Sequence, residues 1–471
     1  MKEGATIVRA FSRYLLCVSL GIGLFGCAVG PDYKKPDVPT PKGWKVAQPG
    51  DASIKGDWWR LFRDPELDRL ENEATSANQS VQVAIGRVDE ARAIARVSMS
   101  RFVPQVAFDP SVARFRTPPD HVPSQFSATA ATAPLDFSYE IDFWGKIRRS
   151  VEATHALAQA SEADLYQVLL TVHGDVASNY FLLRQTDAQI GILQRTVELR
   201  QKTVDLVSQR FQAGLVPELD VDRAKTEYEL ANTSLIEMQR HRENLQNALA
   251  ALCGQPSPSF AIASKALKTT IPDVPAGLPS GLLERRPDIA AAERRMAAAN
   301  AQIGVAKAAF FPAISLTGDA GYSSFHAATL LDWESRLFQI GPSVALPILN
   351  GGRLSATLKA AHANYGTECA SYRDKVLTAF REVSDSLDDL KGYAREAKCQ
   401  ADAIGSASKA ASSAQERYQQ GLIPFVDVLD AQRTELQVEL QAAQIESQRL
   451  VSSVHLIKAL GGGFSAPQLR L

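Results

Sequence analysis

One cysteine near the start of the chain has the sequence context of a modified residue. Cys27 follows Leu24-Phe25-Gly26, and basic residues and a short apolar run precede it. The apolar run, residues 14–26, is shorter than the roughly 20 residues that cross a bilayer as a helix. Leaders of this kind are typical of bacterial lipoproteins, in which the thiol carries a diacylglycerol. The pattern predicts a signal peptide over 1–26 and a lipid on Cys27, and Ala28 in the next position is typical of outer-membrane lipoproteins.

Three charged residues near the other end of the chain share one face of a predicted helix. Asp427, Asp430 and Arg433 lie three residues apart, so their side chains are neighbours on a helix surface. Acidic residues are favoured in the first turn of a helix by its dipole. From the residues alone, the simplest interpretation is a solvated acidic first turn in which Asp430 pairs with Arg433.

The sequence contains no pattern typical of an enzyme. No His-Glu-x-x-His or Cys-x-x-Cys spacing and no Gly-rich phosphate loop occurs. Three cysteines follow Cys27, at positions 253, 369 and 399. Their odd number does not fit a set of disulfides and their spacing does not fit a metal site, so we expect Cys253, Cys369 and Cys399 to be buried small residues. With 51 basic and 52 acidic residues the net charge is −1. The sequence therefore lacks the excess of basic residues that is typical of proteins that bind nucleic acid. We therefore expect no metal and no cofactor besides the covalent lipid.

The positions of the predicted elements follow from an internal repeat. Residues 209–217, QRFQAGLVP, return at 416–424 as ERYQQGLIP, so that Gly421 lies 207 positions after Gly214. His155 and His362 keep the same offset. An internal repeat indicates two similar halves. Within each copy the glycine ends one helix without a Cβ penalty and the proline opens the next, which predicts helix-turn-helix tips at about 212–218 and 419–425.

Each half is predicted to contain a helix, a β-hairpin, a very long helix, a tip and a shorter helix. A Pro-rich tether over 27–64 precedes the first half, 65–270, which ends in an equatorial segment, and the second half covers 271–471. Segments rich in Phe, Val, Tyr and Thr predict the hairpins, at about 104–143 and 312–349. Apolar residues that recur every three or four positions predict close helix packing. The expected long helices are 147–211 and 354–419, and the expected shorter helices are 78–102, 218–252, 288–309 and 425–460.

The hairpins lead to an argument about assembly. Each strand is long enough for the about 9–11 residues of a tilted membrane strand. Four strands cannot close a barrel, and lipid tolerates no open sheet edge. If the hairpins enter a membrane, several chains must pool them, and three chains would supply twelve strands. The expected fold is therefore mainly α, with long coiled-coil-like helices that form an α-barrel in a homotrimer and a shared membrane β-barrel.

Motifs along nearly the whole chain resemble one protein family. They are Gly26-Cys27-Ala28-Val29-Gly30-Pro31-Asp32-Tyr33, Trp58-Trp59 with Phe62 and Asp64-Pro65, Asp142-Phe143-Trp144-Gly145-Lys146, Arg285-Arg286-Pro287-Asp288-Ile289 with Ala292-Glu293, Phe310-Phe311-Pro312, and Pro347 to Arg353. The chain thereby resembles the TolC-type outer-membrane efflux factors, in the lipoprotein branch (OprM/NodT-like) that serves resistance-nodulation-division pumps.

The resemblance implies a passive trimeric duct for small molecules such as drugs and toxic compounds. In this family a β-barrel crosses the outer membrane of a Gram-negative bacterium and an α-helical tunnel crosses the periplasm. An inner-membrane pump of the resistance-nodulation-division type and a periplasmic adaptor protein load the duct. We therefore expect outer-membrane lipid, pump and adaptor as partners, and no nucleic acid.

The resemblance also implies roles for residues at the two tips. The turns would dock the helical hairpins of the adaptor through Gly214, Leu215, Pro217, Gly421, Leu422, Ile423 and Pro424. The closed entrance would be lined by rings of Asp427 and Asp430, with Val426, Arg433 and the latch residue Tyr418 beside them. The chain departs from TolC at Ile423, where TolC carries an arginine, so the latch cannot be carried over whole.

Three alternatives remain open from the sequence. A structural periplasmic lipoprotein without a pore would share the long helices but has no use for membrane-length hairpins. A duct for polypeptides, as in type I protein secretion, would have the same architecture. A secreted hydrolase acting on the cell wall is disfavoured because no nucleophile or metal pattern occurs. The sequence does not name the cargo.

Overall fold

The computed structural model describes most of the chain beyond the predicted leader. The structure describes residues 28–36, 41, 43, 56–116, 127–266, 271, 272, 274, 281 and 285–464. The predicted signal peptide, Cys27 and residues 37–40, 42 and 44–55 of the tether lie outside these residues. The chain divides into two compact units. Unit 1 comprises residues 1–37, 87–161 and 291–372, and unit 2 comprises 38–86, 162–290 and 373–471, so each unit draws on both halves of the repeat.

The order of elements follows the repeat. The helices are η1 (Trp58–Phe62), α2 (Pro65–Ala77), α3 (Gln79–Met99), η2 (Ser100–Phe102), α4 (Lys146–Gln212), α5 (Glu218–Leu252), η4 (Ser257–Ser259), α7 (Pro287–Ala308), η6 (Ala327–Thr329), η7 (Trp333–Ser335), α8 (Arg353–Gln419) and α9 (Phe425–Ala459). The strands are β1 (Gln105–Phe108), β2 (Ser111–Arg116), β3 (Ser127–Ile141), β4 (Ala313–Ser324) and β5 (Arg336–Ala345).

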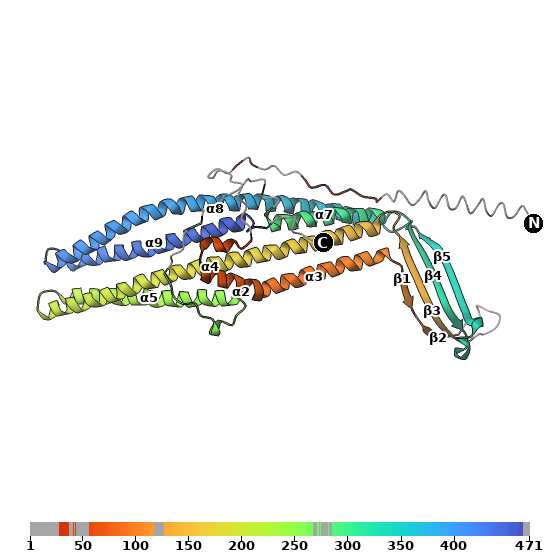
Figure 1. Cartoon of the computed structure of the whole chain (residues 1–471), viewed down its shortest axis with the longest axis horizontal. Helices are drawn as coiled ribbons and strands as arrows, with labels where there is room; N and C mark the ends of the chain where they lie inside the picture. The colour runs from red at the N-terminus through yellow and green to blue at the C-terminus, as the bar shows by residue number, and fades with distance from the viewer. Residues whose placement is uncertain are drawn as a thin grey trace, which may run out of the picture. The chain divides into compact units, whose positions relative to one another are not determined.

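The two halves match in the length of their helices. The long helices α4 and α8 each contain 67 residues, and the shorter helices α5 and α9 each contain 35. Each long helix is joined to its shorter partner by a tight turn (Figure 1). These are the elements of the predicted mainly α fold with β-hairpins. In the part of the chain that the structure describes, no helix is both long enough and apolar enough to cross a bilayer.

Unit 1 contains a single antiparallel sheet, in the order β1/β2–β3–β4–β5. The expected first strand is interrupted: β1 and β2 both pair with β3, and Asp109 and Pro110 separate them. Pro110 has no N–H to donate to a ladder, which accounts for the break at this point. The central pair β3–β4 keeps register from Ala131 opposite Ser324 to Ile141 opposite Ile314, so the two predicted hairpins join into one continuous sheet.

Many apolar side chains of this sheet are exposed in a single copy of the chain. Val112 is 72% exposed and Phe338 is 77% exposed. Ile348 and Leu349, in the segment that follows β5, are more than nine-tenths exposed. The outer strands β1/β2 and β5 each have one edge without a partner strand among the described residues. A sheet with this surface needs an apolar environment or further strands to cover it.

The start of the tether, residues 28–36, is fixed to unit 1 beside its helices. The backbone N–H of Val29 donates to the Trp144 carbonyl at 3.0 Å, and the Asn300 amide donates to the Pro31 carbonyl at 2.9 Å. The Arg149 guanidinium donates to the Asp32 carboxylate at 2.6 Å. Ala28 approaches Gly145 so closely that a Cβ on that glycine would lie 2.7 Å from the Ala28 Cα. Glycine is therefore required at position 145, which also has a φ of 78°.

Unit 2 has an apolar core around the start of α2. Asp64 caps this helix by accepting from the Glu66 N–H at 3.1 Å, and Pro65 occupies the first helical position. The second Asp64 oxygen accepts from the Tyr180 hydroxyl at 2.7 Å. The core around this cap is lined by Trp58, Trp59, Phe62, Leu67, Leu70, Val176, Tyr180, Phe181, Leu249, Leu450 and Val454.

A buried carboxyl–imidazole pair joins α2 to α4 within unit 2. Glu71 Oε2 and His173 Nδ1 lie 2.7 Å apart, and the His173 ring stacks on Trp59. Burial raises the pKa of Glu71 well above its ordinary value of 4.5 and lowers the pKa of His173 from 6.5 to about 4. Both directions favour neutral groups, because a low dielectric penalises the charged forms. Burial in the folded chain therefore favours the protonated carboxyl of Glu71 and the neutral imidazole of His173.

Candidate functional site

The two helix tips of unit 2 have the same backbone geometry. At the first tip Gly214 has a φ of 73°, its N–H donates to the Phe211 carbonyl, and the Leu215 N–H donates to the Arg210 carbonyl at 2.9 Å. At the second tip Gly421, with a φ of 75°, and Leu422 repeat these bonds. This is the Schellman arrangement, which requires a left-handed residue after the helix and satisfies carbonyls that the helix leaves unpaired.

An apolar cluster, here called the tip cluster, packs the two hairpins together. Its buried members come from all four helices: Val207, Val221, Ala224, Tyr418, Phe425, Val428 and Leu429. The rings of Tyr418 and Phe425 lie 5.3 Å apart at 44°. Val216 and Ile423, one from each turn, pack against the cluster. Burial of these side chains holds hairpin α4–α5 against hairpin α8–α9.

Arg210 on α4 connects the first hairpin directly to the end of α8. Its guanidinium donates to the carbonyls of Tyr418 at 3.3 Å and Gln419 at 3.1 Å. The same guanidinium lies over the Tyr418 ring, 4.9 Å from its centre. A cation at a helix C-terminus is stabilised by the helix dipole and by unpaired carbonyls. Among the described residues the buried hydroxyl of Tyr418 has no hydrogen-bond partner, so the latch role predicted for Tyr418 stays a prediction.

A buried carboxylate bridges three helices further from the turns. Glu227 on α5, only 3% exposed, accepts at Oε2 from Arg200 of α4 at 2.5 Å. Its Oε1 accepts from Arg433 of α9, with the Arg433 Nε at 2.9 Å. The side chain of Arg200 is 7% exposed, and that of Arg433 is 55% exposed. We call this group the Arg-Glu-Arg bridge, and it links the two hairpins through charge as the tip cluster does through apolar contact.

The bridge shifts the pKa of each of its members. Burial alone would raise the pKa of Glu227, but the hydrogen bonds and charges of Arg433 and Arg200 leave it below its ordinary value. Burial lowers the pKa of Arg200, and the nearby charge of Arg433 adds to that effect. The hydrogen bond with Glu227 raises the pKa of Arg433. All three groups are therefore charged at neutral pH, and one carboxylate serves two guanidinium groups.

The structure brings together most of the residues predicted at the tips. Leu215 and Leu422 project from the turns, 73% and 62% exposed, whereas Ile423 packs inward. Val426 is 37% exposed, and Asp427 and Asp430 are exposed on the same helix. The pairing expected between Asp430 and Arg433 is long, at 3.5 Å, because Glu227 takes the better-placed guanidinium nitrogens.

Arg210, Arg200 and Glu227 are site residues that the sequence did not single out. Arg200 does occupy one position of the regular apolar seam along α4, and Glu227 falls in step with the buried positions Val221 and Ala224 of α5. A charged side chain in a buried seam needs a partner of opposite charge. The placement of Arg200 and Glu227 at such positions was the feature of the sequence that could have indicated a buried ion pair. Across the described part of the chain no group of three or more His, Cys, Asp or Glu side chains is placed to hold a metal ion.

Comparisons with known proteins give one consistent result. The sequence pattern of the family described as "Outer membrane efflux protein" matches residues 70–255 and 278–462. The chain is 33% identical over 461 residues to the solvent efflux pump outer membrane protein SrpC of Pseudomonas putida, with 94% of this chain and 97% of SrpC covered. It is 32% identical to the outer membrane protein OprJ of Pseudomonas aeruginosa, with 97% and 96% covered. The solved structure of the Campylobacter jejuni outer membrane channel CmeC is similar, with a TM-score of 0.89 at 25% identity and with 94% and 96% covered.

Proposed function

Because the chain belongs to the family of outer membrane efflux proteins, and so is an efflux channel of the outer membrane and not an enzyme, we propose that three copies form its duct and that the two tips form its gate. The observation that carries the gate is the meeting of two hairpins at the tip cluster, with exposed carboxylates beside it. In this proposal a displacement of one hairpin from the other widens the inner end of the duct.

The sheet of unit 1 supports a homotrimer. In one copy the sheet has two edges without a partner strand among the described residues, on β1/β2 and on β5. An open edge is not tolerated in lipid, because unpaired N–H and C=O groups cost several kcal/mol there. Three copies would join these edges into a closed barrel of twelve strands, with the interrupted β1/β2 counted as one strand. An even number of antiparallel strands is usual for bacterial barrels.

Carboxylates at the second tip support an electrostatic constriction. In a trimer Asp427 and Asp430 would each occur three times around the axis, with Val426 beside them. Rings of carboxylates attract cations and repel one another. Such rings favour small cationic or neutral molecules at the closed entrance, and their mutual repulsion must be offset by the contacts that hold the hairpins together.

The position of residues 28–36 supports a lipid on Cys27. Ala28 lies against Gly145 and Val29 bonds Trp144, at the end of β3 and the start of α4. The described chain thus begins at Ala28, beside the end of the sheet that we assign to the membrane. An acyl chain on Cys27 would enter the membrane leaflet that adjoins this end of the sheet and add about 0.8 kcal/mol for each buried methylene.

We infer small molecules as the cargo and two protein partners for loading. SrpC, a protein similar over nearly its full length, is named for a solvent efflux pump. The exposed Leu215 and Leu422 at the turns offer apolar contacts to the helical hairpins of a periplasmic adaptor. The energy for transport would come from an inner-membrane pump of the resistance-nodulation-division type, because the chain has no nucleotide-binding pattern of its own.

The gate is tested by single-channel conductance in planar bilayers. The purified wild type should open rarely and to small conductances, because the tip cluster and the bridge hold the hairpins together. The double substitution Asp427→Ala, Asp430→Ala should change ion selectivity and enlarge or lengthen the openings, because the charged constriction is removed. The double substitution Asp402→Ala, Glu396→Ala removes two exposed charges from the middle of α8 and serves as the control.

Two outcomes would contradict the proposal. No conductance from protein that is folded and trimeric by native mass spectrometry would leave the pore without support. Equal effects of the tip substitutions and the α8 control substitutions would mean that net charge, and not a constriction at the second tip, governs the current.

A further inference from the structure

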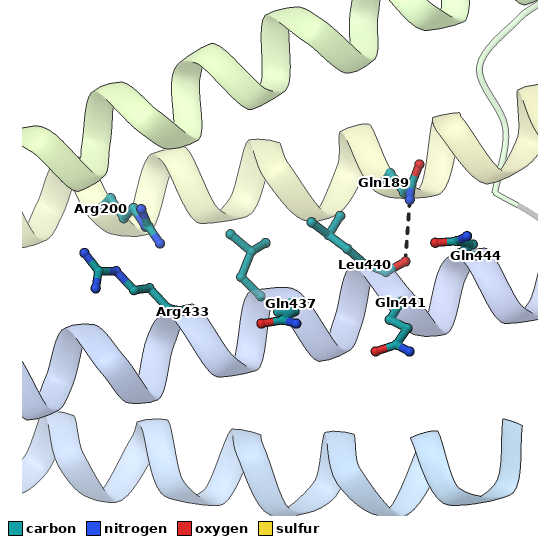
Figure 2. A pocket seen from close by; sticks show the side chains of 8 residues that line it. Gln189, Arg200, Arg433, Gln437, Leu440, Gln441 and Gln444 are labelled. Atoms are coloured by element: carbon teal, nitrogen blue, oxygen red, sulfur yellow. Dashed lines mark hydrogen bonds between the residues drawn. The ribbon is translucent and has the colours of Figure 1, made fainter. Parts of the chain in front are cut away.

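A polar groove lies between α4 and α9, beside the Arg-Glu-Arg bridge. The groove is open to solvent and has a volume of about 520 Å³. Figure 2 shows its walls, with Gln189 and Arg200 on α4 and Arg433, Gln437, Leu440, Gln441 and Gln444 on α9. The Gln189 amide reaches the Leu440 carbonyl only at the limit of hydrogen bonding, 3.5 Å. The groove therefore combines two guanidinium groups, four amide side chains and an apolar strip formed by Leu436 and Leu440.

The end of the groove near Arg200 carries an excess of positive charge. Both guanidinium groups lie in the space between the two helices in Figure 2, and Glu227 supplies one negative charge for the two. Asp430 approaches Arg433 only at 3.5 Å, and its side chain is 67% exposed, so water screens most of its charge. A partly enclosed excess charge favours a bound counter-ion.

Arg200 also has donors to offer. Both hydrogen bonds that it makes to residues described by the structure, to the backbone and the side chain of Glu227, start from Nη1. Its Nε and Nη2 thus have no acceptor among these residues, although only 7% of the side chain is exposed. Guanidinium N–H groups in a fixed fork match the two oxygens of a carboxylate. Arg200 lines the groove, so a ligand oxygen there can accept from these donors.

We propose that this groove binds an amphipathic organic carboxylate. The carboxylate would lie at the Arg200 end, where Nε and Nη2 of Arg200 and the outer edge of Arg433 can donate to it. The apolar body would lie along Leu436 and Leu440, and the glutamine amides would accept or donate at its polar edges. A volume of about 520 Å³ lies within the usual range of sites for drug-sized molecules and exceeds what an inorganic ion needs. A ligand there would add a second bridge between α4 and α9.

Calorimetric titration of the full chain in detergent tests the proposal, with phenylbutyrate as the probe and phenylbutyramide as its uncharged match. The wild type should bind the carboxylate saturably in the millimolar range and bind the amide about tenfold more weakly, the ratio expected for loss of a charge-assisted hydrogen bond. Arg433→Gln leaves one guanidinium balanced by Glu227, so it should weaken binding of the carboxylate by a similar factor.

Two further variants separate binding from folding. Gln441→Glu places a negative charge in the groove at an exposed position without touching the bridge, and it should weaken binding of the carboxylate even if Arg433→Gln proves unstable. Arg195→Gln removes a positive charge from α4, the helix that carries Arg200. Arg195 is 70% exposed, pairs with Glu439 at 3.8 Å and does not line this groove. This substitution should leave the affinity unchanged.

Three results would overturn the proposal. They are the absence of saturable binding of phenylbutyrate to the wild type, equal affinity for the carboxylate and the amide, and equal loss of affinity in Gln441→Glu and Arg195→Gln. Because the titration requires no pore, it can fail while the conductance test succeeds, and it can succeed while that test fails.

Discussion

The bridge centred on Glu227 permits a quantitative test of what holds helices α4, α5 and α9 together. Glu227→Gln keeps the size of the side chain and removes the charge. Arg200, with 7% of its side chain exposed, would then be a buried cation without a carboxylate. Breaking a buried pair by removing one partner costs about 3–5 kcal/mol. The contact with Arg433 adds at most about 1 kcal/mol, because that side chain is 55% exposed and solvent screens it.

We therefore expect Glu227→Gln to destabilise the helical unit by about 3 kcal/mol. At roughly 2 °C for each kcal/mol, as for large domains, the midpoint of thermal unfolding should fall by about 6 °C. Circular dichroism of the detergent-solubilised protein, at one protein concentration, provides this midpoint. The channel should also open more often in planar bilayers, since one of the links between α4 and α9 is lost.

Two matched variants make the reasoning refutable. Arg433→Gln removes the exposed partner and should cost no more than about 1 kcal/mol. The double variant Arg200→Gln, Glu227→Gln removes both buried charges and should recover part of the stability that the single variant loses, because no uncompensated charge remains. If Glu227→Gln unfolds within a degree of the wild type, or if the double variant is less stable than Glu227→Gln alone, the bridge does not stabilise the packing of these helices.

Two other predictions concern the turn and the buried pair. Gly421→Ala should destabilise the second tip by about 1–2 kcal/mol, because the φ of Gly421, 75°, is left-handed. Gly405→Ala, inside α8 where an added Cβ would meet open space, should instead stabilise the protein by roughly 0.5–1 kcal/mol. Thermal unfolding of both variants tests this, and equal shifts of the two midpoints would contradict it. The pair of Glu71 and His173 should make stability fall as pH rises above about 6.5, because burial raises the pKa of Glu71 in the folded state while the unfolded chain has already lost this carboxyl proton. Between about 4.5 and 6.5 the extra proton on the unfolded histidine offsets that on the folded carboxyl, so the midpoint should be flat there. Glu71→Gln should remove the fall in stability above about 6.5, and a wild-type midpoint that does not fall above that pH would show that burial does not raise the pKa of Glu71.

Local rules on the chain were sufficient for most of the fold. The glycine and proline of each tip set the ends of the helices, and α4 runs over Lys146–Gln212 where the sequence indicated 147–211. The 207-residue offset required the two halves to contain similar elements, and the helices on either side of the tips, α4 with α8 and α5 with α9, are equal in length. The interruption at Pro110 was not expected. It follows from a missing N–H in a strand that otherwise has a regular pattern.

The candidate site was harder to predict than the fold. Asp427 and Asp430 could be placed on one helix face by spacing alone, but spacing also suggested that Arg433 pairs with Asp430. The structure gives Arg433 a stronger partner, Glu227, which lies 206 residues away. Such pairing depends on which helices are neighbours, and one sequence does not contain that information. The docking and gating roles of the tip residues remain predictions for the same reason.

The Arg-Glu-Arg bridge also bears on the origin of the two halves. Positions offset by 207 from Arg200 and Glu227 carry Ala407 and Thr434, and the position matching Arg433 carries Thr226. Gene duplication thus left the backbone of the two tips alike, and later divergence placed the bridge across only one of the contacts between hairpins. In the proposed trimer, six tips with nearly sixfold backbone symmetry would be reduced to threefold symmetry by side chains alone. A loading partner would therefore meet two chemically distinct kinds of tip in alternation around the entrance.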